Sequence, residues 1–136
     1  MVYPINKDPL SLARKSVPAT EQDLCIGQDL LDTLRAHEEE CVGMAANMIG
    51  FHKRIIVVNA DGQLLLMFNP EILRTSGRYE AEEGCLSLEG IRPVTRFRSI
   101  KVRYQDVNFA IRIKTFTGWT AQIIQHEIDH CNGVLI

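Results

Sequence analysis

Two histidines and a glutamate near the end of the chain have the spacing of a metal centre. The segment QHEIDH, residues 125–130, places His126 and His130 four positions apart, with Glu127 directly after the first histidine. Side chains four positions apart project from one face of an α-helix, so both imidazoles can bind one metal ion. Glu127 lies about 100° around the helix, where its carboxylate can reach a metal-bound water without binding the metal. This HExxH pattern predicts a catalytic metal site; the competing interpretation is a buried helix with two hydrogen-bonded histidines.

The residues after this pattern do not supply a third ligand. In the extended protease pattern HExxHxxGxxH, the third histidine would fall at Ile136. Cys131 directly follows His130 and therefore points about 100° away from it, so these two side chains cannot easily bind the same ion. The third ligand must come from upstream in the chain, which disfavours a general zinc protease.

A cysteine in a glycine-flanked turn is the best upstream candidate. The remaining histidines, His37 and His52, have the surroundings of solvated surface residues. Cys85 lies in EEGCLSLEG, residues 82–90, just before a strand-like segment, where a turn can present a thiolate inward. Two imidazoles and one thiolate leave a fourth position open for water, which is the catalytic arrangement. We therefore expect Cys85, His126 and His130 to bind a divalent ion in a hydrolase.

An amphipathic helix is expected in the N-terminal part of the chain. The stretch TEQDLCIGQDLLDTLRAHEEE, residues 20–40, offers Thr20 as a cap and an acid three positions later. Leu24, Leu31 and Leu34 then recur at helical spacing and predict one buried face.

Two hairpins and a last helix complete the expected fold. RIIVVN and QLLLMFNP flank the turn ADG, while IKVRY and FAIRI are separated by QDVN, with Ile100, Val102 and Tyr104 on one buried face. The last helix is expected at about residues 117–132, largely buried and terminated by Gly133. These elements predict an α+β fold in which antiparallel β-sheets pack around a central C-terminal helix that carries the HExxH pattern.

Length and composition fit one globular domain over residues 1–136. The chain contains 46% hydrophobic and 24% charged residues and has a net charge of −2. No apolar run approaches the roughly 20 residues that span a bilayer, and the start lacks the apolar core of a signal peptide, so we expect a cytoplasmic protein without membrane attachment. The charge balance argues against stable binding of nucleic acid. The basic stretch at residues 92–103 is interpreted as a strand with alternating solvated charges.

Three sequence blocks together resemble the peptide deformylases, a family that removes the formyl group from N-formylmethionine at the start of new polypeptides. The blocks are EGCLS around Cys85, QHEIDH in the last helix, and CVGMAANMIG at residues 41–50. The third block matches the family pattern GxGxAAxQxG at four positions, which are Gly43, Ala45, Ala46 and Gly50. The order and spacing of the blocks also agree, as do the early DPLSL and the GW that opens the last helix, so the resemblance covers nearly the whole chain.

The resemblance implies a specific chemistry. Cys85, His126 and His130 would bind one divalent ion, Fe²⁺ in the native enzyme, with Zn²⁺, Ni²⁺ or Co²⁺ as substitutes in prepared protein. Glu127 would take a proton from the metal-bound water and deliver it to the departing amine. The metal and the backbone N–H of Leu86 would meet the developing oxyanion. The implied partners are N-formylmethionyl peptides or nascent chains.

The resemblance also implies residues that contact the substrate. Gly43 would run alongside the substrate backbone, and Val42, Trp119 and Ile123 would lie near the methionine pocket. The full set of expected substrate-binding residues is Val42, Gly43, Met48, Glu83, Gly84, Arg92, Trp119 and Ile123. Of these, Glu83 and Arg92 match family positions that shape and brace the site.

Two positions depart from the family pattern. Cys41 replaces the first glycine, and Met48 replaces a glutamine whose side chain donates to the oxyanion. Methionine has no N–H, and losing one such donor typically costs on the order of 10²–10³ in turnover. Asn47 is adjacent, but its side chain is expected to point elsewhere. We therefore expect a deformylase with a reduced rate; the alternative is a catalytically weak or inactive protein that binds metal and peptide ends.

The chain ends about where the family usually continues into a further strand or helix. In one branch of the family that helix docks on the ribosome. We therefore expect a catalytic domain that lacks a C-terminal extension and does not dock on the ribosome through such a helix.

Overall fold

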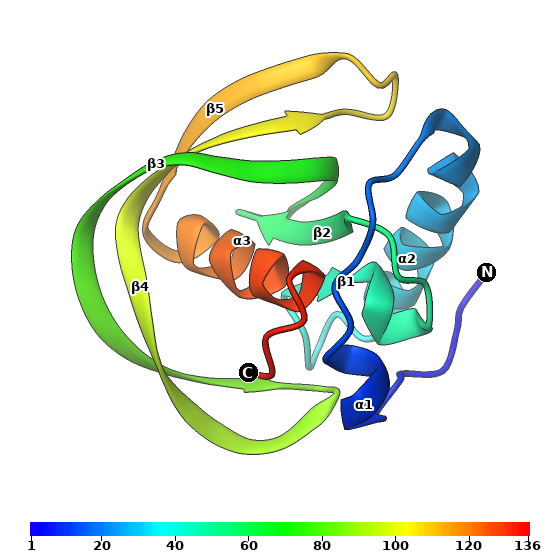
Figure 1. The fold of residues 1–136 in the computed structure, drawn as a ribbon, viewed down its shortest axis with the longest axis horizontal. Coiled ribbons are helices and arrows are strands. Elements are labelled where there is room, and N and C mark those ends of the chain that lie inside the picture. Colours follow the sequence, from blue (N-terminus) through cyan, green and yellow to red (C-terminus); the bar gives the residue numbers. More distant parts are fainter.

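The chain folds around one five-stranded antiparallel sheet whose strands are neighbours in chain order (Figure 1). The computed structural model describes residues 1–136. The strands are β1 (Gly43–Ala45), β2 (Ile55–Ala60), β3 (Gln63–Cys85), β4 (Leu88–Gln105) and β5 (Ile111–Thr117). The helices are α1 (Pro9–Leu12), α2 (Leu24–Ala36) and α3 (Gly118–Cys131), with the short 3₁₀ helices η1 (Glu21–Asp23) and η2 (Ala46–Ile49). The predicted α+β fold, with antiparallel strands around a C-terminal HExxH helix, is confirmed.

Strand β2 is buried on both faces because it lies between α3 and α2. Ile56 and Val58 belong to the core cluster that includes the apolar side chains of α3. Ile55 and Val57 alternate with them and belong to the second cluster, together with leucines of α2. This two-sided burial explains the uninterrupted apolar run of the strand. Burial of each such aliphatic side chain stabilises the fold by roughly 1.5–3 kcal/mol, so β2 contributes to the packing of both core clusters.

Strands β3 and β4 form a long bent hairpin that wraps around α3 (Figure 1). Register shifts interrupt the ladder at several points, the last of them between Glu83 and Cys85. Such irregularities bend a strand and increase its local twist. The bend brings the end of β3, with Cys85, back against His130 of α3.

Helix α3 begins and ends within one residue of the predicted bounds. Its side chains are largely buried, as predicted, and pack against β2 and β4. Gly133 has a φ of +75°, and a Cβ there would lie 2.4 Å from the backbone oxygen of Ala13. The glycine therefore both ends the helix and lets this end pack against the segment after α1.

The N-terminal amphipathic helix is confirmed, with Leu34 buried and Leu31 packed against the core as predicted, but Leu24 is not on the buried face. Thr20 donates its N–H to the Asp23 carboxylate at 2.8 Å, and a 3₁₀ turn precedes α2. Leu24 is 38% exposed, whereas the buried face includes Gly27, Leu30 and Leu34. A Cβ at position 27 would lie only 2.6 Å from the Phe68 ring. Helix α2 therefore packs closely against the sheet at Gly27, about one turn after Leu24.

Both predicted hairpins are present. Asp61 and Gly62, each with a positive φ, form the two-residue turn between β2 and β3. In the second hairpin, β4 pairs with β5, and Ile100, Val102 and Tyr104 are buried as predicted. None of the helices has the length and apolar character needed to traverse a bilayer.

Candidate metal centre

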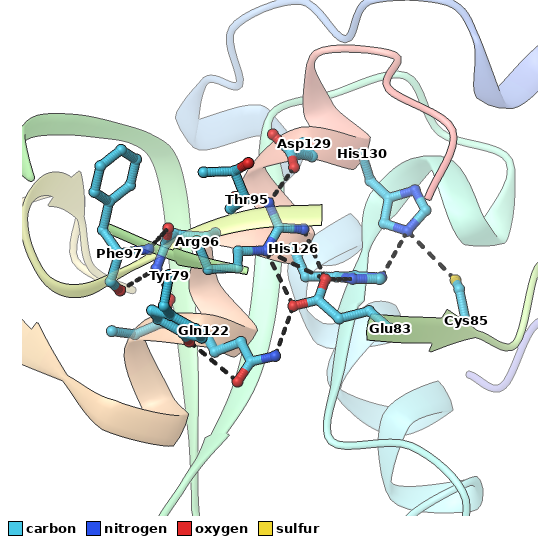
Figure 2. Close-up of polar contacts among 12 residues, drawn as sticks. Tyr79, Glu83, Cys85, Thr95, Arg96, Phe97, Gln122, His126, Asp129 and His130 are labelled. Atoms are coloured by element: carbon cyan, nitrogen blue, oxygen red, sulfur yellow. Dashed lines mark hydrogen bonds and ion pairs between the residues drawn. The ribbon is translucent and has the colours of Figure 1, made fainter. Parts of the chain in front are cut away.

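The three predicted ligand side chains meet between β3 and α3 (Figure 2). His126 and His130 are one helical turn apart, and their Nε2 atoms are 3.2 Å from each other. The Sγ atom of Cys85 lies 3.3 Å from Nε2 of His130, and all three ligand atoms lie within 4.8 Å of one another. Atoms bound about 2.0–2.3 Å from one tetrahedral ion lie roughly 3.3–3.7 Å apart, so the cluster has the dimensions of a three-ligand site.

The electrostatics of the cluster fit a cation. Burial lowers the pKa of His130 to about 3, so this ring is neutral and keeps a nitrogen lone pair for a metal. Burial also opposes a charge on His126, but hydrogen bonds with Cys85 and Glu83 outweigh it and raise the pKa of His126 to about 10. The groups around His126 therefore stabilise positive charge, which a divalent ion would also bring. Two imidazoles and a thiolate fit such an ion.

Glu83 holds the first histidine in place. Its Oε1 atom lies 2.8 Å from Nδ1 of His126, and its carboxylate also accepts hydrogen bonds from Arg96 and Gln122. Burial would raise the pKa of Glu83, but the hydrogen bonds from these three side chains lower it to about 2. An ionised carboxylate on Nδ1 holds a proton there, so the proton on Nε2 is the one that a bound metal would displace. Glu83 was expected among the substrate-binding residues; it lines the cavity, but its carboxylate is directed to the metal cluster.

Arg96 is a functional candidate that the sequence interpretation missed. Its side chain is 5% exposed and contacts both Glu83 and Asp129 at 2.7 Å (Figure 2). The interpretation of residues 92–103 as a strand with solvated charges is therefore wrong for Arg96, because two carboxylates compensate its burial. The two-residue period of β4 was the available signal, since position 96 falls on the same alternation as Ile100 and Val102.

Glu127 is a buried carboxylate beside this cluster. Its side chain lines the cavity, and its Oε1 atom has no hydrogen-bond partner. Burial raises the pKa of Glu127 to about 7, with smaller opposing effects of nearby charges. Gly43 makes room for it, because a Cβ there would lie 2.8 Å from Oε2 of Glu127 and 2.6 Å from Ile123.

One cavity of about 410 Å³ contains most of the predicted site residues. The predicted residues that line it are Val42, Gly43, Met48, Glu83, Gly84, Cys85, Leu86, Trp119, Ile123, His126 and Glu127. Glu40, Cys41, Glu82 and Gln122 line it as well and were not predicted. Arg92 is not among the lining residues; it lies opposite Glu83 in the β3–β4 ladder, and its expected role in bracing the site stays a prediction.

Neither Met48 nor the adjacent Asn47 offers a side-chain donor to the cavity. The Met48 side chain is 1% exposed, and its Sδ atom accepts a hydrogen bond from the Ala45 N–H at 3.4 Å. Asn47 donates its Nδ2–H to the backbone oxygen of His130 at 2.9 Å, so its side chain is bound to α3 and does not line the cavity.

Comparison with known proteins agrees with this geometry. The model of the family described as polypeptide deformylase matches residues 2–136. The chain is 51% identical to a peptide deformylase of Clostridium beijerinckii over the full length of both. Among solved structures, the peptide deformylase of Thermotoga maritima superposes with a TM-score of 0.89 at 32% identity, covering 99% of this chain and 95% of that one. The Met-Ala-Ser-bound class I type b peptide deformylase of Acinetobacter baumannii has a TM-score of 0.87 at 33% identity, with 99% and 97% covered. The chain therefore belongs to the peptide deformylase family of metal-dependent hydrolases.

Proposed function

We propose that this protein removes the formyl group from N-formylmethionine at the N-termini of newly made polypeptides, with residues 1–136 acting as one catalytic domain. The observation that supports this best is the position of Glu127. Its buried carboxylate has a free oxygen and lines the same cavity as Cys85 and His126. We propose Fe²⁺ as the native ion, and the same ligand set also suits Zn²⁺, Ni²⁺ or Co²⁺.

Each polar group of the site has a role in this proposal. Cys85, His126 and His130 would hold a divalent ion, and that ion would supply Lewis acidity for the hydrolysis. Glu127 takes a proton from the attacking water and passes it to the departing amine. The backbone N–H of Leu86 donates to the formyl oxygen as negative charge develops on it.

The walls of the cavity suit a methionine side chain and an extended backbone. Val42, Trp119 and Ile123 provide apolar surface, while Gly43 and Gly84 let a peptide backbone come close. The similar Acinetobacter baumannii enzyme was solved with Met-Ala-Ser bound, which supports a peptide that begins with methionine. Nascent chains are the proposed partners, and this substrate places the proposed reaction in the cytoplasm.

We also propose that Met48 lowers the rate. Its sulfur accepts the Ala45 N–H and has no hydrogen to donate toward the formyl oxygen. Of the groups that this chain itself would offer to the formyl oxygen in the proposed mechanism, the Leu86 N–H would remain as a donor, whereas Met48 would not.

Formate release from a formyl-Met-Ala-Ser peptide tests the proposal. The protein is loaded with iron or nickel without oxygen and compared with the Glu127→Gln variant, which keeps the shape of the side chain but cannot carry the proton. We expect metal-dependent formate release by the wild type and a loss of at least about 10²-fold in the variant, in the range of a lost general base. Equal formate release by the two proteins would contradict the proposal.

A further inference from the structure

The free edge of β1 faces the candidate site. β1 is the edge strand of the sheet and pairs only with β2. The Val42 carbonyl accepts the Asn59 N–H from β2 at 2.8 Å, so Val42 points its backbone toward the sheet. In an antiparallel ladder the next residue points its N–H and C=O the other way, which directs the Gly43 carbonyl to the free edge. Gly43 lines the cavity, so this carbonyl is a backbone acceptor beside the site.

A thiol already uses this acceptor. The Sγ atom of Cys41 lies 2.7 Å from the Gly43 oxygen, and Cys41 lines the same cavity. Burial, aided by the nearby Glu127 charge, raises the pKa of Cys41 to about 12, so the sulfur keeps its hydrogen and donates it. A peptide N–H that donates to this oxygen needs its nitrogen at about 2.9 Å from it, so it competes with the thiol for the same acceptor.

A second, independent observation points to a ligand at this place. Glu127 is 4% exposed and lines the cavity with an unpartnered Oε1 atom. Its Oε2 atom lies 2.8 Å from the position of a Cβ on Gly43. A bound molecule that reaches the Glu127 carboxylate therefore passes along the backbone of Gly43.

We propose that Cys41 controls the affinity for peptide, because its thiol blocks the Gly43 carbonyl that an extended substrate backbone needs and must turn aside when the peptide binds. An extended peptide gains affinity by adding main-chain hydrogen bonds to an exposed strand edge. Here it first displaces a bond that the protein makes with itself. The inference deepens the proposed deformylase function by assigning a role in substrate binding to Cys41.

Peptide binding without turnover tests this role. Trp119 is the only tryptophan of the chain and lines the cavity, so its fluorescence reports binding there. Nickel-loaded wild type, Cys41→Ala and Cys41→Ser are titrated with unformylated Met-Ala-Ser. Cys25→Ala, which removes an exposed thiol of α2, serves as the matched control. Circular dichroism and metal content establish that all four proteins are folded and loaded alike.

The expected pattern is specific to the thiol hydrogen bond. Cys41→Ala should lower the Kd about threefold to tenfold, the range of one net hydrogen bond. Cys41→Ser keeps a donor at this position and should stay within about twofold of wild type, as should Cys25→Ala. In formate release the gain of Cys41→Ala should appear in KM and not in kcat.

Two outcomes overturn the role of Cys41: a Kd of Cys41→Ala equal to or above that of wild type, or the same gain in Cys41→Ser as in Cys41→Ala. Because the titration needs no turnover, it is independent of the formate assay. Absent formate release with a lower Kd in Cys41→Ala would reject the proposed reaction and retain the binding role.

Discussion

At the scale of single residues, two sulfur-containing side chains contact the free edge of β1, where the family pattern has a glycine at position 41 and a glutamine at position 48. The Cys41 thiol donates to the Gly43 carbonyl, and the Met48 thioether accepts the Ala45 N–H. Both are weak hydrogen-bonding groups that satisfy the protein's own backbone. Neither sulfur provides the amide donor that the family glutamine offers at position 48.

The first prediction concerns Met48→Gln. The glutamine carbonyl can accept the Ala45 N–H that Met48 now accepts, which leaves the side-chain NH₂ free to donate into the cavity. We expect kcat for formate release to rise by about 10-fold to 10²-fold, somewhat less than the typical effect of one oxyanion donor. Met48→Leu is the matched control, because it fills the same space without any donor. A similar gain in both variants would contradict the oxyanion explanation.

The second prediction concerns Arg96, the buried arginine between two carboxylates. Arg96→Met fills the space but leaves Glu83 and Asp129 without their cation, and breaking a buried ion pair in this way costs about 3–5 kcal/mol. Urea unfolding of the metal-loaded protein measures the change in the free energy of unfolding. Arg98→Met is the control on the same strand, since Arg98 is exposed and stacks over Tyr79, a contact worth about 0.5–1 kcal/mol. Equal losses in the free energy of unfolding of the two variants would contradict a stabilising role of the Arg96 ion pairs beyond that of an exposed arginine.

At the scale of elements, some parts of the site follow from local pattern and others do not. The helical period places His126 and His130 on one face of α3, so their proximity could be predicted from spacing alone. Cys85 could be found from its glycine-flanked turn, but its contact with His130 depends on the bends of β3 and β4, which go with register shifts in the ladder between these two strands. Arg96 was missed because its two partners lie on β3 and α3, and neither is near it in sequence.

The third prediction concerns the end of α3. Gly133→Ala places a Cβ at a positive φ and also 2.4 Å from the Ala13 backbone oxygen, so the helix end cannot keep its packing against the segment after α1. Gly62→Ala is the matched control, with a φ of +92° and no atom within 4 Å of the added Cβ. The control should cost about 1–2 kcal/mol from the backbone conformation alone, and Gly133→Ala should cost at least about 1 kcal/mol more. Urea midpoints of both variants give the comparison, and equal midpoints would mean that the close contact is not limiting.

At the scale of the whole molecule, the proposed ion would link the end of β3 to α3. Cys85 comes from the end of the bent β3, whereas both histidines come from α3, so the three ligands are assembled only in the folded chain. A ligand that binds the folded state and not the unfolded chain raises the free energy of unfolding. Binding of the proposed ion and folding of the β3–β4 hairpin around α3 would therefore be coupled.

The last prediction follows from this coupling. Free metal at about 100 times its Kd adds about 2.7 kcal/mol to the free energy of unfolding, so adding nickel to chelated protein should raise the Tm by roughly 8–10 °C. His130→Ala removes one ligand that is completely buried, and its Tm should respond much less to the same metal. His37→Ala is the matched control, because this histidine lies at the end of α2, and it should keep the full response. Differential scanning calorimetry measures all three proteins with and without metal. A Tm of the wild type that does not change with metal, or an equal rise in His130→Ala, would contradict the assignment of this cluster as the metal centre.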